Sequence, residues 1–221
     1  MCNGESMGLL AGINARRSCR AFKDTPLSPA LLKSVFEYAT FSPSAKNTQP
    51  WEAYVITGEK LAALRAKMLS DLRDGRTAQV GRGSADTEAR RRRARELSTE
   101  MTPFIERQGW EGGSFVERSV RFFDAPCAVV VCMDEPEGKY HALDVGMFVQ
   151  TLCLSATGHG LGSCILGYPL IVEPAIREFL QLPNDRRVMV CVALGFPDME
   201  QPMAQFESSR AELEENVHFM M

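Results

Sequence analysis

Hydrophobic residues follow two different spacings along this chain, and the two alternate. Helical spacing predicts helices over residues 8–15, from Pro29 to Ala39, and over 59–72, 140–157 and 174–180. Alternating or continuous apolar runs predict strands over residues 52–57, 128–133, 163–166 and 187–194. Because strands and helices interleave, the pattern indicates a layered α/β or α+β fold.

Local signals mark where several of these elements begin and end. Ser28 followed by Pro29 is typical of a helix N-cap and first helical position. Residues 128–133 are continuously apolar, which fits a strand in the middle of a sheet that is covered on both faces. Gly158 and Gly160 end the long apolar helix before them.

Residues 73–114 depart from this pattern. They contain the run Arg90–Arg93, with Glu96 and Glu100 nearby, and we predict a long solvated helix with a loop on each side. A nucleic-acid patch is the alternative for the basic run, and salt-dependent retention of DNA would support it. The end of the stretch is rich in glycine, which indicates a mobile loop around Gly109, Gly112 and Gly113.

Length and composition favour one domain over residues 1–221. The chain has 221 residues, 45% hydrophobic and 24% charged, with a formal net charge of −3. Such a chain builds a single core, and its charge gives no general affinity for nucleic acid. The last residues, 206–221, show little helical pattern and are predicted to form an arm. No linker or repeat divides the chain.

The seven cysteines are predicted to be buried free thiols. Their number is odd, they are scattered, and none shows metal spacing. This favours a reducing compartment, and we expect a cytoplasmic protein. The first eight residues lack the features of a signal peptide, and no apolar run approaches 18 residues. The three histidines are far apart, so we expect neither a zinc site nor a membrane span.

A first candidate for chemistry is the basic segment Arg16-Arg17-Ser18-Cys19-Arg20. Three guanidinium groups and a hydroxyl within five residues can hold a phosphate through charge-assisted bonds. A solvated charged turn is the alternative. Ser208-Ser209-Arg210 in the tail adds a fourth arginine, which can complete a phosphate clamp if the two segments meet.

A second candidate is the loop from Ser42 to Trp51. Two prolines restrain it, and Ser44, Asn47 and Gln49 offer hydroxyl and amide groups. Such groups match the alternating donors and acceptors along the edge of a flavin. A proline-rich turn entering a strand is the alternative for this segment.

The glycines from Gly158 to Gly162 superficially resemble a dinucleotide-binding fingerprint. That fingerprint follows a strand and opens a helix, whereas these glycines close a helix and lead into a strand. We therefore reject a Rossmann interpretation. The backbone at Leu166 and Gly167 can still approach a planar ligand closely, because Gly167 has no side chain.

No catalytic side chains stand out: the chain has no nucleophile elbow, no P-loop and no evident triad. This absence favours a redox cofactor that carries the chemistry itself.

Taken together, these segments resemble the nitroreductase family of flavoproteins. The resemblance runs over nearly the whole chain, and its most specific piece is Pro-Ser-x-x-Asn-x-Gln-Pro-Trp, from Pro43 to Trp51. The other matching pieces are Arg16 to Phe22, Asp124-Ala125-Pro126, Gly160 to Ser163, Val192 to Pro197, and Ser209-Arg210 ahead of a tail ending Glu215 to Phe219.

The resemblance implies an α+β fold with a mixed central sheet flanked by helices. It also implies an intertwined homodimer with two FMN sites at the interface, in which the arm at 206–221 extends the partner's sheet. Residues 73–114 correspond to a variable insertion near the active site. An open cleft is expected along 104–123, lined by Trp110, Phe115, Phe122 and Phe123, although ordinary core is an equal alternative for the last two.

The resemblance also implies roles for single residues. Arg16, Arg17, Ser18 and Arg210 match phosphate or ribityl positions, and Arg20 matches a basic position beside the pyrimidine edge. Pro43, Ser44 and Asn47 match positions that reach the flavin from the partner subunit. Leu166 and Gly167 match the backbone near the reactive flavin nitrogen.

This chain departs from the family pattern at two places. Arg118 and Arg121 fall where a polar residue and a lysine are frequent, and only Arg121 is provisionally added to the site. Leu166 replaces the acidic residue that many members carry before the glycine matched by Gly167. The second departure leaves the backbone donor intact but bears on hydride-donor preference.

The implied activity is a ping-pong reaction in which NAD(P)H reduces FMN, and an electron-poor nitroaromatic or quinone reoxidises it. Related activities are enone reduction, removal of halogen from aromatics, and consumption of flavin itself. A non-enzymatic alternative is a protein that binds or sequesters flavin without turnover.

Overall fold

The computed structural model describes residues 8–78, 87–110, 114–134 and 139–221. The strands are β1 (Trp51–Thr57), β2 (Cys127–Asp134), β3 (Gly162–Leu166) and β4 (Arg186–Gly195). The α-helices are α1 (Leu9–Ala15), α2 (Pro29–Ala39), α3 (Gly58–Arg73), α4 (Glu88–Arg107), α5 (Ser114–Val120), α6 (Lys139–Gly158), α7 (Glu173–Leu180) and α8 (Pro202–Gln205). Short 3-10 helices are η1 (Ala45–Asn47), η2 (Phe122–Asp124), η3 (Tyr168–Val172) and η4 (Leu213–Glu215).

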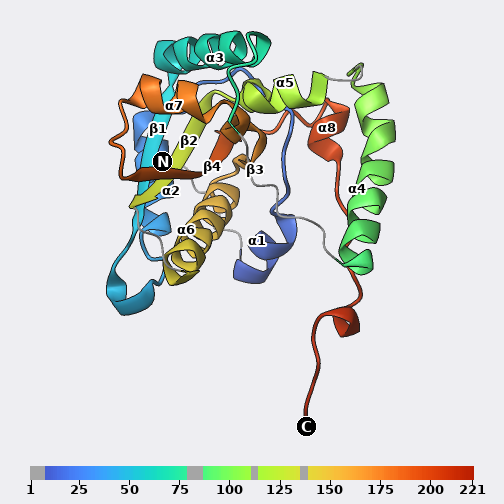
Figure 1. Ribbon diagram of the computed structural model, residues 1–221. Helices are drawn as coiled ribbons and strands as arrows, with labels where there is room; N and C mark the ends of the chain where they lie inside the picture. The colour runs from blue at the N-terminus through green and yellow to red at the C-terminus, as the bar shows by residue number, and fades with distance from the viewer. Residues whose placement is uncertain (1–7, 79–86, 111–113, 135–138) are drawn as a thin grey trace.

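The described strands form one sheet in the order β1-β2-β4-β3 (Figure 1). Each neighbouring pair is antiparallel. The parallel component expected of a mixed sheet is limited, in this part of the chain, to an isolated bridge between Ser18 and Ser163. The predicted α+β class is confirmed. β1 and β3 are the edge strands, and the outer side of β3 is bridged to Ser18 at Ser163.

Each face of the sheet carries its own hydrophobic core. Along β2, Val130 and Cys132 point into a core shared with α3, α5 and α7. Val129 and Val131, on the opposite face, pack with α2 and α6. Side chains alternate between the two faces of a strand, so a strand covered on both faces needs an unbroken apolar run. This explains the sequence of β2.

The residues that the sequence predicted to begin α2 and to end α6 cap these helices in the structure. The Ser28 hydroxyl accepts a hydrogen bond from the Leu31 amide at 3.2 Å, as an N-cap does. Gly160 has a φ of +75°, the left-handed conformation that commonly closes a helix. His159 is structural, as expected, because it lies 2.9 Å from the Ser34 hydroxyl and ties α6 to α2.

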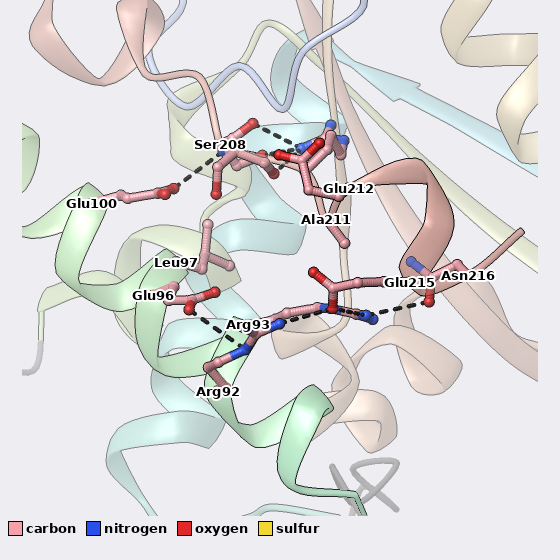
Figure 2. A pocket seen from close by; sticks show the side chains of 12 residues that line it. Arg92, Arg93, Glu96, Leu97, Glu100, Ser208, Ala211, Glu212, Glu215 and Asn216 are labelled. Atoms are coloured by element: carbon pink, nitrogen blue, oxygen red, sulfur yellow. Dashed lines mark hydrogen bonds and ion pairs between the residues drawn. The ribbon is translucent and has the colours of Figure 1, made fainter.

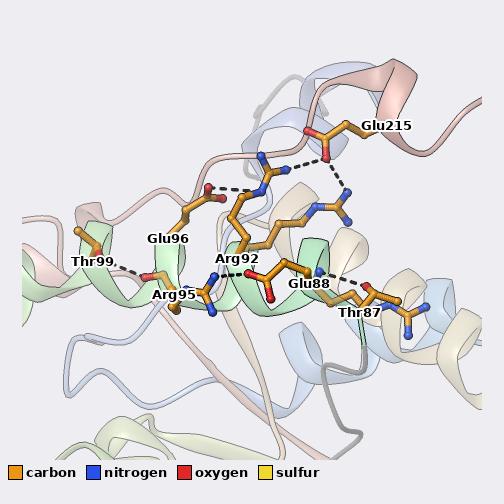
Figure 3. Close-up of polar contacts among 9 residues, drawn as sticks. Thr87, Glu88, Arg92, Arg95, Glu96, Thr99 and Glu215 are labelled. Atoms are coloured by element: carbon orange, nitrogen blue, oxygen red, sulfur yellow. Dashed lines mark hydrogen bonds and ion pairs between the residues drawn. The ribbon is translucent and has the colours of Figure 1, made fainter.

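The long charged helix expected within residues 73–114 is α4. Several of its arginines pair with carboxylates of the same helix (Figure 3): Glu88 pairs with Arg91 at 3.3 Å and with Arg95 at 2.6 Å, and Glu96 pairs with Arg92 at 3.7 Å. Part of the basic run is therefore engaged in ion pairs along its own helix. The loop expected at Gly112 and Gly113 lies outside the described residues.

The tail is exposed, but it begins later than the sequence indicated. Phe206 is 4% exposed and packs edge-on against Phe104, with ring centroids 5.2 Å apart. The expectation that residues 206–221 lack a core of their own is therefore wrong for Phe206. The tail beyond it leaves the body of the subunit (Figure 1), and Phe219, Met220 and Met221 are exposed.

The described cysteines and helices can be compared with two further expectations, buried free thiols and no membrane span. The described cysteines are free and buried, as predicted; Cys2 lies outside the described residues. Within the described ranges, no helix is both long and apolar enough to cross a bilayer.

Gly195 is expected to tolerate no side chain. A Cβ at this position would lie 2.6 Å from Cδ of Pro126 and 3.0 Å from the Phe22 ring. Because a proline ring cannot move aside, Gly195→Ala should lower the free energy of unfolding by about 1–3 kcal/mol. Urea denaturation measures this. The matched control is Gly158→Ala, where a Cβ meets nothing within 4 Å; an equal loss in both variants would contradict the packing explanation.

Candidate functional site

The basic segment after α1 lies along the end of the sheet. The Cys19 amide donates to the Ser163 carbonyl at 2.9 Å, and the Lys23 amide donates to the Phe196 carbonyl at 2.9 Å. Gly162 permits this approach, because a Cβ there would lie 2.9 Å from Cβ of Cys19. The arginine cluster and the glycine-rich segment, far apart in sequence, are thus brought together.

Arg16 is a half-buried cation without a counterion. In the described part of the chain its guanidinium makes no ion pair and no side-chain hydrogen bond. Its charge acts on the buried end of the sheet: burial raises the pKa of the Cys164 thiol to about 12, and the positive charges of Arg20 and Arg16 oppose that rise. A partly desolvated cation with no partner favours the binding of an anion.

Arg17 and Ser18 are already engaged within the chain. Arg17 pairs with Glu207 at 3.2 Å and donates to the Arg16 carbonyl at 3.1 Å and to the Asn14 carbonyl. Ser18 takes part in the backbone bridge to Ser163. The segment is therefore fixed to the start of the tail and to β3, with the Arg16 side chain left unpaired.

Arg20 and Arg118 line one small cavity of about 210 Å³, together with Trp110. The Arg20 guanidinium donates to the Ser18 carbonyl at 3.1 Å and lies 5.8 Å from the ring centroid of Phe206. Arg118 stacks on Trp110 at 4.8 Å, and its Nε is buried without a hydrogen-bond partner. The cavity therefore has two arginines and an aromatic wall, and its lining also includes the carboxylates Asp124 and Asp198.

The Arg121 side chain does not line this cavity and forms an ion pair instead. Its guanidinium pairs with Asp124 at 2.6 Å, within the η2 turn. Sequence reasoning weighed Arg121 above Arg118, but the side chain that shares the cavity with Arg20 is that of Arg118. Three positions separate the two residues, so they lie on one helical face, and only packing distinguishes them.

The aromatic residues expected to line an open cleft belong mostly to the core. Phe122 is fully buried, and Trp110 stacks on Phe123 with centroids 5.6 Å apart. Phe115 contacts both rings edge-on. The core alternative is thus correct for Phe122, while Trp110 and Phe123 also form part of the cavity wall.

Arg210 lines a groove of about 450 Å³. Figure 2 shows this groove between α4, which carries Glu100, and the tail, which carries Ser208. The tail is anchored on both sides of Arg210: the Ser209 amide donates to Glu100 at 3.2 Å, and Glu215 pairs with Arg92 and Arg93 at 2.8 and 3.0 Å. The Arg210 guanidinium bonds to Ser208 at 2.6 Å rather than to the first cluster. It lies three residues beyond Glu207, which pairs with Arg17.

The loop holding Pro43, Ser44, Asn47 and Gln49 lies away from these arginines. In Figure 1 the short turn at 45–47 and the tail are on opposite sides of α6. Asn47 and Gln49 are exposed, with φ of 57° and 47°. The Ser44 hydroxyl accepts from the Gln49 amide at 3.0 Å. Within one chain, this loop and the arginine cluster are therefore not brought together.

Leu166 ends β3 and Gly167 follows it, on the strand that contacts the basic segment at Ser163. Leu166 is 5% exposed and its side chain belongs to the core, so only its backbone can face a ligand. Gly167 is exposed, and a Cβ there would meet open space. The described residues thus leave room for a planar group beside this backbone.

Comparison with known proteins decides the family. The profile described as "Nitroreductase family" matches residues 13–196. The chain belongs to the nitroreductase family.

Relatives of this nitroreductase match over nearly their whole length. It is 31% identical to the chloronitrobenzene nitroreductase of Comamonas testosteroni, covering 94% of this chain and 95% of the relative. It is also 31% identical to the nitrobenzene nitroreductase of Ectopseudomonas oleovorans, with the same two coverages of 94% and 95%. The crystal structure of the FMN and NADPH-dependent nitroreductase NfnB from Sphigopyxis sp. strain HMH has a TM-score of 0.87 at 26% identity, covering 97% of this chain and 99% of that one.

Sequence reasoning missed three partners of the nitroreductase's arginines. Glu207 pairs with Arg17, Phe206 lies under Arg20, and Trp110 supports Arg118. Glu207 and Phe206 precede Ser208 directly, so the tail signal was present, but nothing in the local pattern shows that this segment crosses the end of the sheet.

Proposed function

We propose that this nitroreductase binds FMN and uses NADH or NADPH to reduce nitroaromatic or quinone-type acceptors in a ping-pong reaction. The observation that carries the proposal is the half-buried Arg16 guanidinium, which has no counterion among the described residues. Arg16 is two positions before Ser18, which is bridged to Ser163 near the start of β3. The names of the relatives, with chloronitrobenzene and nitrobenzene as acceptors, supply the substrate class.

The residues fit the parts of FMN by the chemistry of their donors. Arg16, Arg17 and Ser18 would hold the phosphate, because guanidinium forks and hydroxyls match phosphate oxygens. Arg210 would join them from the tail, which approaches through the Arg17–Glu207 pair. The backbone at Gly167 would border the ring, in the open space beside it.

Arg20 and Arg118 would lie along the pyrimidine edge. When bound, FMN supplies the two-electron transfer between nicotinamide and acceptor. The two guanidinium groups line one cavity, together with Asp124 and Asp198, and they would stabilise negative charge at that edge. The Arg118 Nε, buried without a partner, is the donor that such a ring would satisfy.

We place the protein as a homodimer, in which each site takes residues from both subunits. Pro43, Ser44, Asn47 and Gln49 lie across α6 from the arginine cluster, so they would reach the flavin of the partner. The arm of one subunit would add to the open edge of the other's sheet at β1. A groove of about 460 Å³ runs along that edge and is lined in part by Tyr54, Ile56 and Phe179.

The cellular compartment follows from the thiols. The described cysteines are free and buried, and burial raises the pKa of Cys19 to about 11 and of Cys127 to about 12. Free thiols of this kind persist in a reducing environment, so we propose the cytoplasm.

The absorbance spectrum of the purified protein, before and after anaerobic addition of NADH and NADPH, tests the function. We expect bound flavin that heat releases as FMN rather than FAD. We expect bleaching by a nicotinamide, recovery with nitrobenzene or a quinone, and parallel lines in steady-state plots. Flavin that neither nicotinamide bleaches would favour a sequestering protein, and no flavin after reconstitution would contradict the proposal.

A further inference from the structure

The turn that carries Ser44 and Asn47 has a costly backbone. Lys46, Asn47 and Gln49 have φ of 53°, 57° and 47°. L-residues rarely adopt this left-handed region, because Cβ then crowds the carbonyl oxygen. Three such residues within four positions persist only where surrounding contacts hold them. The contacts that hold this turn therefore decide how the Ser44 and Asn47 side chains are oriented.

Bonds within the turn close it on itself. The Asn47 amide donates to the Ser44 carbonyl at 3.0 Å, and the Gln49 amide donates to the Ser44 hydroxyl at 3.0 Å. The Gln49 side chain donates to the Asn47 carbonyl at 3.3 Å. These bonds set the internal shape of the turn but do not fix it to the rest of the subunit.

The attachment to the body comes from α6. The Ala45 amide donates to Oδ2 of Asp144 at 3.1 Å. Asp144 is 2% exposed, and the other buried carboxylate of the described residues, Asp71, has Arg76 as its ion-pair partner. Asp144 makes no ion pair in this part of the chain. A buried carboxylate needs hydrogen-bond donors in place of water, and here the donor is the turn.

We propose that Asp144 is a positioning residue: its buried carboxylate holds the Ser44–Gln49 turn in the left-handed conformation that presents Ser44 and Asn47 to the flavin of the partner subunit. The second half of this statement rests on the proposed function. The carboxylate acts through the Ala45 amide and touches neither cofactor nor substrate.

Two substitutions break the same contact from opposite sides. Asp144→Ala removes the acceptor. Ala45→Pro removes only the donor, because Ala45 is the first residue of a 3-10 turn, where proline is tolerated, and Ser44 before it is extended at φ −147° and ψ 155°. Asp144→Asn keeps an acceptor oxygen. Asp71→Asn is the matched control, a buried carboxylate away from the turn.

Hydrogen exchange of the 41–50 peptide measures the turn without reference to flavin. Asp144→Ala and Ala45→Pro should each speed exchange, Asp144→Asn should largely restore the wild-type rate, and Asp71→Asn should leave this peptide unchanged. With FMN, the first two should raise its Kd by about tenfold, the size expected for loss of one charge-assisted bond. They should also alter the visible circular dichroism of the flavin.

The double variant Asp144→Ala with Ala45→Pro should be no worse than the worse single variant, because both remove one contact. Wild-type exchange and FMN affinity in both single variants overturn the proposal while the proposed function stands. A wild-type chain that binds no FMN overturns the proposed function, and the exchange rates still decide whether Asp144 holds the turn. If Asp144→Ala does not fold, Ala45→Pro decides alone.

Discussion

Removal of residues 212–221 is expected to convert a dimer into monomers and to reduce bound FMN. The tail beyond Phe206 has no apolar core within its own subunit: Val217, Phe219 and Met220 are 42%, 66% and 94% exposed. Its contacts with the rest of the same chain are polar: Glu215 forms ion pairs with Arg92 and Arg93 (Figure 3). Exposed ion pairs of this kind contribute little, about 0–1 kcal/mol each.

The size of the effect follows from apolar burial. A large apolar side chain that is fully buried contributes about 1.5–3 kcal/mol. Three of them placed on a partner therefore strengthen dimerisation by about 10³-fold or more. Because the proposed flavin site takes the 43–49 turn from the second subunit, loss of the dimer should also remove half of each site.

Light scattering and flavin absorbance on the truncated chain measure both consequences, and Arg210 is retained so that a phosphate contact is not removed as well. Val217→Asp combined with Phe219→Asp should reproduce the loss without shortening the chain. Glu214→Ala, an exposed change in the same tail, should keep dimer and flavin. A truncated monomer with full FMN occupancy would show that each site is complete within one subunit.

Replacement of Arg16 by alanine is expected to raise the Kd for FMN by about 10- to 150-fold. This corresponds to about 1.5–3 kcal/mol for one charge-assisted contact to phosphate. Arg16 is chosen because its guanidinium has no ion-pair partner in the described chain, so its removal leaves no other residue unpaired. Fluorescence quenching on titration of the apoprotein with FMN measures the Kd.

Matched variants separate charge from geometry. Arg16→Lys should recover part of the affinity, since it restores charge but not the guanidinium fork. Arg90→Ala removes one exposed arginine from α4 and should leave the Kd unchanged. Arg210→Ala should weaken FMN to a similar degree as Arg16→Ala. Unchanged affinity in both Arg16→Ala and Arg210→Ala would place the phosphate elsewhere.

Most of the secondary structure could be predicted from the sequence because its causes are local, although the short helices α5 and α8 were not. The apolar run of β2, the Ser28 cap and the glycine end of α6 depend on neighbours within a few residues. Even the charged helix α4 follows from its own pattern, since Glu88 and Glu96 pair with arginines three to seven positions away. The family followed from the same local motifs, in particular the segment from Pro43 to Trp51.

The sequence could not predict which of the candidate site residues lie close together in space. Arg16 and Arg17 are adjacent, yet one is left unpaired and the other pairs with Glu207 across 190 positions. Arg118 and Arg121 are three positions apart, yet one lines a cavity and the other pairs with Asp124. Local propensity cannot separate such pairs, because the side-chain types are identical and the difference lies in which surface each one meets.

The sequence alone determined the strands, most of the helices and the α+β class, and it supplied the residue types on which the proposed phosphate and flavin site rests. Only the tertiary structure decided which arginine is left without an ion pair, that Phe206 belongs to the core, and that Asp144 accepts a hydrogen bond from Ala45. The physical reason is the sequence separation between the residues that interact. Helix and strand patterns arise from contacts over a few residues, whereas these partners meet because the sheet brings the chain segments 16–23, 162–166 and 196–207 to one end, and no local pattern encodes that meeting.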